Sequence, residues 1–309
     1  MRIRAFFVIA VLLLPGVARA DMTDVAQQDN WTLHTATGAL TKDYFCASSA
    51  QFTQGKNSYG LTVARNLLGQ SSLVITWPGL GATPGSAVDV RVSLEQKPLR
   101  DITATAGSAN TLVAPLGWDN DAVDQLAAAP RVSLAVGTTT VQYELKDNAD
   151  AIHRLGSCTA AALEKLPDSS GLSSEVRGMF KKAGISAVHQ VPAHGGENFM
   201  VGDLFGGSEI LPANKNKPDL TQSMLDEMDA LEARCHARFS SDLGAPVPTV
   251  EGGELVTAEA QCSTLHSGSF TAMSFVRHGD VTQVYYVETD QNRADQARAL
   301  RDKIAGALK

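Results

Sequence analysis

The chain has few of the residue patterns that mark a catalytic or nucleic-acid-binding protein. Its 309 residues include only four cysteines, and aromatic side chains make up 6%. After residue 20, Lys181-Lys182 is the only adjacent basic pair. Nucleic-acid binding and polybasic membrane-surface binding both require clustered positive charge. We therefore predict no nucleic-acid partner and no membrane-surface patch.

Long apolar runs are also lacking beyond the N-terminus, which has the parts of a secretory signal. Arg2 and Arg4 precede the apolar run 5–14, and Ala18-Arg19-Ala20 fits the small-x-small cleavage pattern. We predict cleavage after Ala20, no transmembrane segment thereafter, and a periplasmic or secreted protein. Loss of the three arginines in this segment takes the net charge from −7 to −10.

Catalytic motifs are missing too: the sequence contains no Gly-x-Ser-x-Gly elbow, no His-Glu-x-x-His and no phosphate-binding loop. We predict no catalytic residues, no cofactor and no metal. An alternative metal or hydrolase site could be built from three residues that lie close in sequence, His189, His194 and Glu197.

The four cysteines, Cys46, Cys158, Cys235 and Cys262, form an even set, which in an oxidising compartment predicts disulfides. Three pairings are possible. We favour Cys46–Cys158 with Cys235–Cys262, because a breaker-rich stretch separates the two pairs. A metal site of Cys and His is the rival interpretation, although no Cys-x-x-Cys is present.

Residues 21–166 have the pattern of an antiparallel β-sandwich-like domain with a closing helix. Short runs rich in β-branched and aromatic residues alternate with Gly and Pro turns. Residues 88–94 alternate strictly between apolar and polar side chains, as in a half-buried strand. Residues 121–129 predict a short helix, and a longer helix begins at Asn148.

Residues 167–174 are polar and predict a linker, and 175–309 predict an α/β two-layer domain with an antiparallel sheet. The longest predicted helix covers residues 220–239, with a stripe that includes Cys235 and Phe239. Residues 254–262, 270–276 and 281–288 read as strands before a final helix. The fold class is therefore α+β.

From Trp31 to Cys158 the order of features resembles the invasion-associated locus B family of periplasmic proteins from alphaproteobacteria. The residues that carry the resemblance are Trp31, Cys46, the strands 72–76 and 88–94, the helix 121–129, the hairpin 132–145 and the helix 149–158. The resemblance implies a β-sandwich and an envelope role linked to host interaction, and it implies no catalytic residues.

We favour a non-enzymatic envelope protein that acts by protein–protein binding or as an accessory factor, with another envelope protein as its partner. The alternatives are a periplasmic small-ligand or metal-binding protein, and a hydrolase with an unrecognised site. An open sheet edge or an exposed apolar patch would support binding. A deep polar pocket with convergent titratable groups would support an enzyme.

Overall fold

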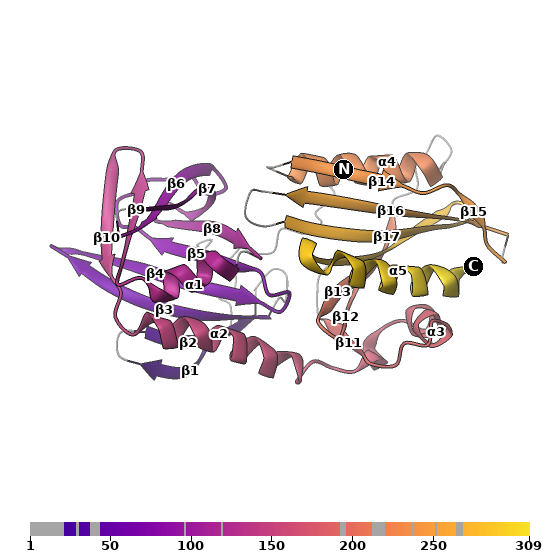
Figure 1. Ribbon diagram of the computed structural model, residues 1–309, viewed down its shortest axis with the longest axis horizontal. Helices are drawn as coiled ribbons and strands as arrows, with labels where there is room; N and C mark the ends of the chain where they lie inside the picture. Colours follow the sequence, from indigo (N-terminus) through magenta and orange to yellow (C-terminus); the bar gives the residue numbers. More distant parts are fainter. Residues whose placement is uncertain are drawn as a thin grey trace. The chain divides into compact units, whose positions relative to one another are not determined.

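The computed structural model describes residues 22–28, 31–37, 44–95, 97–118, 120–191, 196–211, 220–235, 238–250, 252–263 and 268–309 (Figure 1). The predicted signal segment 1–20 and His194 lie outside these residues. The chain forms two compact units, residues 1–165 and 166–309, and each is described by itself. In the described part of the chain, no helix is long and apolar enough to cross a membrane.

The described residues of the first unit form ten strands and two helices. They are β1 (Met22–Gln28), β2 (Trp31–Thr37), β3 (Tyr44–Gln54), β4 (Asn57–Asn66), β5 (Ser71–Thr76), β6 (Ala87–Leu94), β7 (Lys97–Ser108), β8 (Thr111–Gly117), α1 (Asn120–Ala128), β9 (Arg131–Val136), β10 (Thr139–Glu144) and α2 (Asn148–Leu163). All strand pairs are antiparallel, in the order β1-β2-β3-β4-β5-β8-β7-β6-β9-β10.

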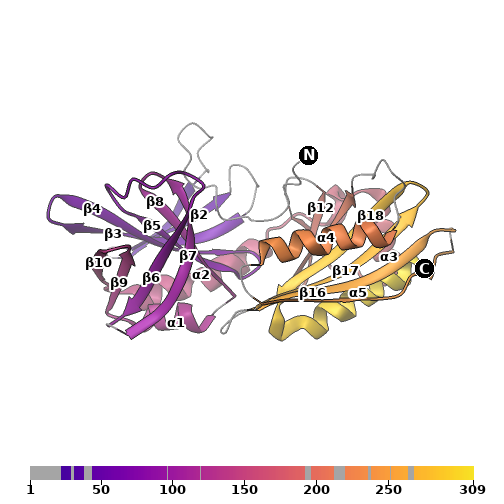
Figure 2. The ribbon, with the colours of Figure 1, turned by 90° about the horizontal axis from the view of Figure 1, so that it is seen from above.

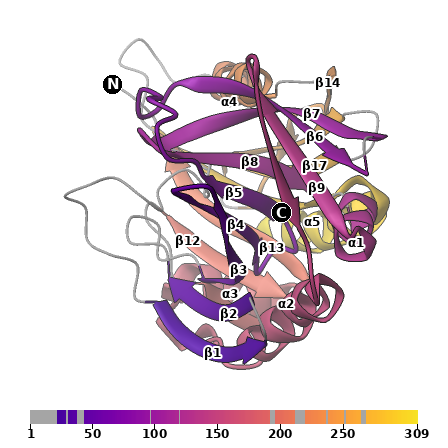
Figure 3. The same ribbon diagram turned by 90° about the vertical axis from the view of Figure 1, so that its left-hand side faces the viewer.

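This sheet curls until distant strands face each other, as Figure 3 shows. Tyr143 on β10 meets Phe52 on β3 edge to face, with ring centroids 4.8 Å apart. The expected sandwich is thus one continuous hydrogen-bonded sheet folded over a shared core rather than two separate sheets. Strand β6 alternates as predicted, with Val90 and Val92 buried and Arg91 exposed.

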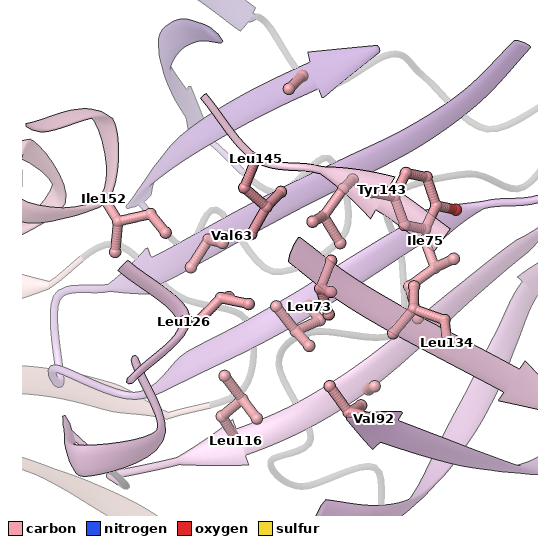
Figure 4. Close-up of a cluster of buried hydrophobic side chains, with 14 of the residues drawn as sticks. Val63, Leu73, Ile75, Val92, Leu116, Leu126, Leu134, Tyr143, Leu145 and Ile152 are labelled. Atoms are coloured by element: carbon pink, nitrogen blue, oxygen red, sulfur yellow. The ribbon is translucent and has the colours of Figure 1, made fainter. Parts of the chain in front are cut away.

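The two helices complete the core of this unit (Figure 4). Leu126 of α1 and Ile152 of α2 pack among the buried strand residues. The Cys46–Cys158 disulfide joins α2 to β3, and the Trp31 indole N–H donates to the carbonyl of Lys146 just before α2. The disulfide closes the helix onto the sheet as expected, and the hydrogen bond from Trp31 adds a second connection.

The second unit holds eight strands and three α-helices in its described part. They are α3 (Ser174–Lys182), β11 (Val188–Val191), β12 (Glu197–Val201), β13 (Leu204–Leu211), α4 (Leu220–Arg234), β14 (Arg238–Leu243), β15 (Val247–Pro248), β16 (Glu254–Ser263), β17 (Gly268–His278), β18 (Val281–Asp290) and α5 (Ala294–Leu308). Short 3-10 helices span Ser169–Gly171 and Gln291–Arg293. The antiparallel strand order is β11-β12-β13-β18-β17-β16-β14, and β15 also pairs with β16.

Helices cover both faces of this sheet, so the expected two-layer arrangement is wrong. Figure 2 shows α4 on one side of the strands and α5 on the other. Met224 of α4 packs against Val256 and Phe275, whereas Leu300 of α5 packs against Val276 and other residues of the opposite face. The stripe on each helix predicted packing correctly, but a stripe does not tell which face of a sheet the helix covers. We call the two faces the α4 side and the α5 side.

The predicted helix 220–239 ends five residues early, at Arg234. Cys235 lies just after the helix and forms the second disulfide with Cys262 of β16. Phe239 lies in β14, where it still packs against the cluster on the α4 side. The apolar spacing therefore continued past the helix end because a strand supplied the next contact to the same core.

The expected linker 167–174 belongs to the second unit in the structure. Leu172 is buried in the α5-side core, and the Ser173 side chain caps the start of α3 by accepting from the amide of Val176. Polar, breaker-rich composition here reflects a 3-10 turn and a helix cap rather than a free connection.

Candidate functional site: an open sheet edge

Of the three residues proposed as a metal or hydrolase site, the structure describes His189 and Glu197, and it does not bring these two side chains together. Glu197 accepts hydrogen bonds from the backbone amide and the hydroxyl of Ser173, at the start of α3. His189 pairs with Met200 in the sheet and Glu197 with Ser208, and strand alternation places these two side chains on opposite faces. His194 is outside the described residues. Among described residues, no group of three metal-ligating side chains gathers.

The second sheet ends in two edge strands, and its own chain covers the first of them, β11. The Gln190 amide donates to the carbonyl of Pro167 at 2.9 Å, and its side chain donates to the carbonyl of Gly171. An isolated antiparallel bridge joins Asp168 to His189. Unpaired strand edges invite pairing with other chains, and residues 167–171 remove that possibility here.

The other edge strand, β14, pairs with β16 on one side only, as far as the described residues show (Figure 1). The register runs from Arg238 opposite Ser263 to Leu243 opposite Ala258. Five of its six side chains are exposed, and only Phe239 is half-buried. The sheet therefore presents one edge along which another strand could be added.

The direction of the backbone groups of β14 follows from one hydrogen bond. The Gly244 amide donates to the carbonyl of Thr257 at 2.8 Å, just beyond the pairing of Leu243 with Ala258. In antiparallel ladders, residues alternate between those bonded to the partner and those facing away. The even-numbered residues of β14 therefore bond to β16. The N–H and C=O groups of Phe239, Ser241 and Leu243 point outward.

Side chains of different character border this edge on the two faces. Phe239 and Leu243 lie on the α4 side, and Leu243 is 37% exposed. Ser240 and Asp242 lie on the α5 side, because Asp242 pairs with Glu259, which accepts from Arg298 of α5. The hydrogen bond to Glu259 raises the pKa of Arg298. The α4-side rim thus carries two apolar side chains with Ser241 between them, and the α5-side rim is polar.

Both ends of the open edge are fixed. The Cys235–Cys262 disulfide, with Cα atoms 5.6 Å apart, anchors the chain just before β14. At the other end, a Cβ on Gly244 would lie 2.9 Å from the carbonyl oxygen of Thr257, so the close approach of the two strands requires glycine. A strand held at both ends loses little conformational entropy when a partner binds. Sequence reasoning missed this edge, because it placed residues 235–239 in a helix.

No family model and no curated protein matches this chain. Among solved structures, it is similar to the crystal structure of invasion associated protein B from Bartonella henselae. The two chains are 18% identical, the similarity covers 42% of this chain and 94% of that chain, and the TM-score is 0.33. The fold and the edge together define a class: a disulfide-containing α+β protein of two antiparallel sheets with an open edge strand.

Proposed function

We propose that this chain is a non-enzymatic envelope protein that binds another protein by taking up an extended segment as a new strand beside β14. The observation that carries the proposal is the row of outward backbone groups at Phe239, Ser241 and Leu243. In strand addition, main-chain hydrogen bonds supply affinity and alternate side chains supply specificity. The segment taken up would turn apolar side chains toward Phe239 and Leu243.

Two disulfides support an oxidising compartment as the place of action. With the signal pattern and cleavage after Ala20, a periplasmic or secreted location is part of the proposal. The order of features from Trp31 to Cys158 supports a relation of that region to the invasion-associated locus B family. We also propose residues 21–166 and 175–309 as the two domains, with residues 167–174 packed onto the second.

A site-specific photo-crosslink tests strand addition. A photo-reactive amino acid in place of Ser240 sits on the exposed α5-side rim. Its own amide bonds to β16, so the outward amides of Phe239, Ser241 and Leu243 stay available to a partner. In intact cell envelope, we expect one discrete adduct that disappears with Ser241→Pro and remains with Ser241→Ala. Proline removes the outward N–H and its ring blocks an incoming strand, while alanine keeps the N–H.

The matched control places the same photo-reactive group at Gln142, an exposed position on β10 of the first unit. An adduct that forms equally from both positions, or that persists in the proline variant, would overturn the proposal. So would the lack of any proline-sensitive adduct from position 240 in cells that export the mature chain.

A further inference from the structure

We infer that the strand that pairs with β14 is β14 of a second copy of this chain, with the two strands antiparallel about a two-fold axis at Ser241. This inference rests on the proposed function and names its partner. Three features of β14 support this axis: the odd numbering of the residues with outward backbone groups, the pairing of all of these groups, and the match of side chains across the axis.

Parity comes first. When a strand pairs antiparallel with its own copy about an axis through one residue, odd-numbered residues meet odd-numbered residues. The outward groups of β14 belong to Phe239, Ser241 and Leu243, all odd. An axis between two residues would set outward groups against inward ones, and the ladder could not form.

The two-fold axis lies at Ser241 because only this position pairs all the outward backbone groups within β14. With the axis there, Phe239 meets Leu243 of the second copy, Ser241 meets Ser241, and Leu243 meets Phe239. Every outward N–H and C=O of the strand is then paired, and each residue pair exchanges two hydrogen bonds. An axis at Ser240 or at Asp242 leaves one end of the strand without its counterpart within β14.

The side chains that would face each other across an axis at Ser241 are also compatible. On the α4 side, Phe239 faces Leu243 of the second copy twice, so the exposed part of Leu243 is covered by an aromatic ring. On the α5 side, the hydroxyl of Ser240 faces the carboxylate of Asp242 twice and can donate to it. An axis at Asp242 would instead set two carboxylates opposite each other, which is destabilising.

Symmetry makes the inference testable by charge exchange at one position. Ser241→Lys and Ser241→Asp each place like charges on the axis, while a mixture of the two variants places lysine opposite aspartate. Sedimentation of the mature full chain in low salt measures the dimer directly. We expect the wild type to dimerise, and each variant alone to dissociate with a Kd raised by about tenfold or more. We expect the equal mixture to recover the dimer.

Amide hydrogen exchange gives an independent reading of the register. On raising the wild-type concentration across its Kd, exchange at Phe239, Ser241 and Leu243 should slow. Ser240 and Asp242, already bonded to β16, should not change. This alternation separates strand pairing from any other mode of association, and it needs no variant to fold.

A wild-type chain that remains monomeric, or a dimer unaffected by both charges at position 241, overturns the inference. Lack of recovery in the mixture overturns it as well, as does protection that does not alternate along β14. These failures differ from failure of the proposed function. If the photo-crosslink from position 240 joins a different protein and is lost with Ser241→Pro, strand addition stands and only the second copy is excluded. If the adduct persists with Ser241→Pro, strand addition itself fails. Gln142→Lys on β10 is the control that leaves the dimer unchanged.

Discussion

The two edge strands of the eight-stranded sheet, β11 and β14, differ in how their outward backbone groups are treated. At β11, residues 167–171 lie along the edge and accept its outward amide. At β14 the described chain leaves the outward groups exposed, yet it fixes the strand with a disulfide at one end and a glycine contact at the other. A sheet can therefore protect one edge with its own chain and keep the other edge rigid for a partner.

Loss of a disulfide is the largest expected effect on this comparison. Replacing Cys235 and Cys262 with serine opens a loop with a sequence separation of 27, which costs about 3–4 kcal/mol of unfolding free energy in the loop-entropy model. The N-terminal end of β14, which follows Cys235, would be released, so its amides should exchange faster. Denaturant unfolding and amide exchange measure the two effects.

The other disulfide is the matched control. Replacing Cys46 and Cys158 removes a closure with a separation of 112, at about 5 kcal/mol, but it should leave exchange along β14 unchanged. If both double variants loosened β14 equally, the local role assigned to Cys235–Cys262 would be wrong.

Proline substitution compares the two edges directly. Gln190→Pro on β11 removes the amide that bonds to Pro167, and we expect a loss of about 2–3 kcal/mol because the carbonyl loses its partner. Ser241→Pro on β14 removes an amide that points away from β16, so at protein concentrations too low for pairing between copies we expect a loss below about 1 kcal/mol. Urea unfolding of the two variants measures both losses of unfolding free energy. Equal losses would contradict the assignment of the Ser241 amide as outward-facing.

Much of the fold could be predicted from local patterns. Strand 88–94, the helices with apolar stripes and the division of the cysteines into two pairs all depend on periodicity or on chain order. No strand is predicted over β7 and β8, and each contains a proline, Pro98 or Pro115, a residue that argues against an interior strand. A strand that contains a proline can be recognised only when the strands that pair with it are known.

The open edge could not be predicted, because it depends on the strand order of the whole sheet. Strand β13 pairs with β18, and β14 is the terminal strand of the order. These pairings join segments far apart in the chain, and no local sequence pattern indicates them. Within residues 238–243 the apolar side chains are only Phe239 and Leu243, and Ser241 between them breaks a strict strand alternation. The preceding helical stripe ran into this segment and concealed it.

Gly244→Ala probes the far end of the open edge. The added methyl would lie 2.9 Å from both the carbonyl oxygen and the hydroxyl of Thr257, so the strands must separate. We expect a loss of about 1–2 kcal/mol, typical of overpacking, together with weaker partner binding. Gly306→Ala in α5 meets open space and should instead stabilise the chain by up to about 1 kcal/mol. Thermal unfolding of both variants measures the difference, and equal shifts would refute the contact.

Titration of Asp168 probes the covered edge with the smallest effect. Hydrogen bonds from the side chain and backbone of Ser170 lower the pKa of Asp168 below its ordinary value of 3.8, and the charges of His189 and Arg177 add to the effect. The folded pKa lies below the unfolded one. The contribution of the ionised carboxylate to stability is therefore complete above the unfolded pKa and is lost as the pH falls through the folded value.

Ser170→Ala removes the hydroxyl but keeps the backbone amide, which lies 2.9 Å from the carboxylate. We therefore expect the pKa of Asp168 to rise only part of the way back toward 3.8, as followed by carbon NMR of its carboxyl group. Ser241→Ala at the open edge is the control and should not move it. A pKa that stays unchanged in Ser170→Ala would mean that the segment covering β11 is held by its backbone contacts alone. The hydroxyl of Ser170 would then contribute nothing to the turn of residues 168–170, and the backbone amide of Ser170 alone would hold the Asp168 carboxylate there.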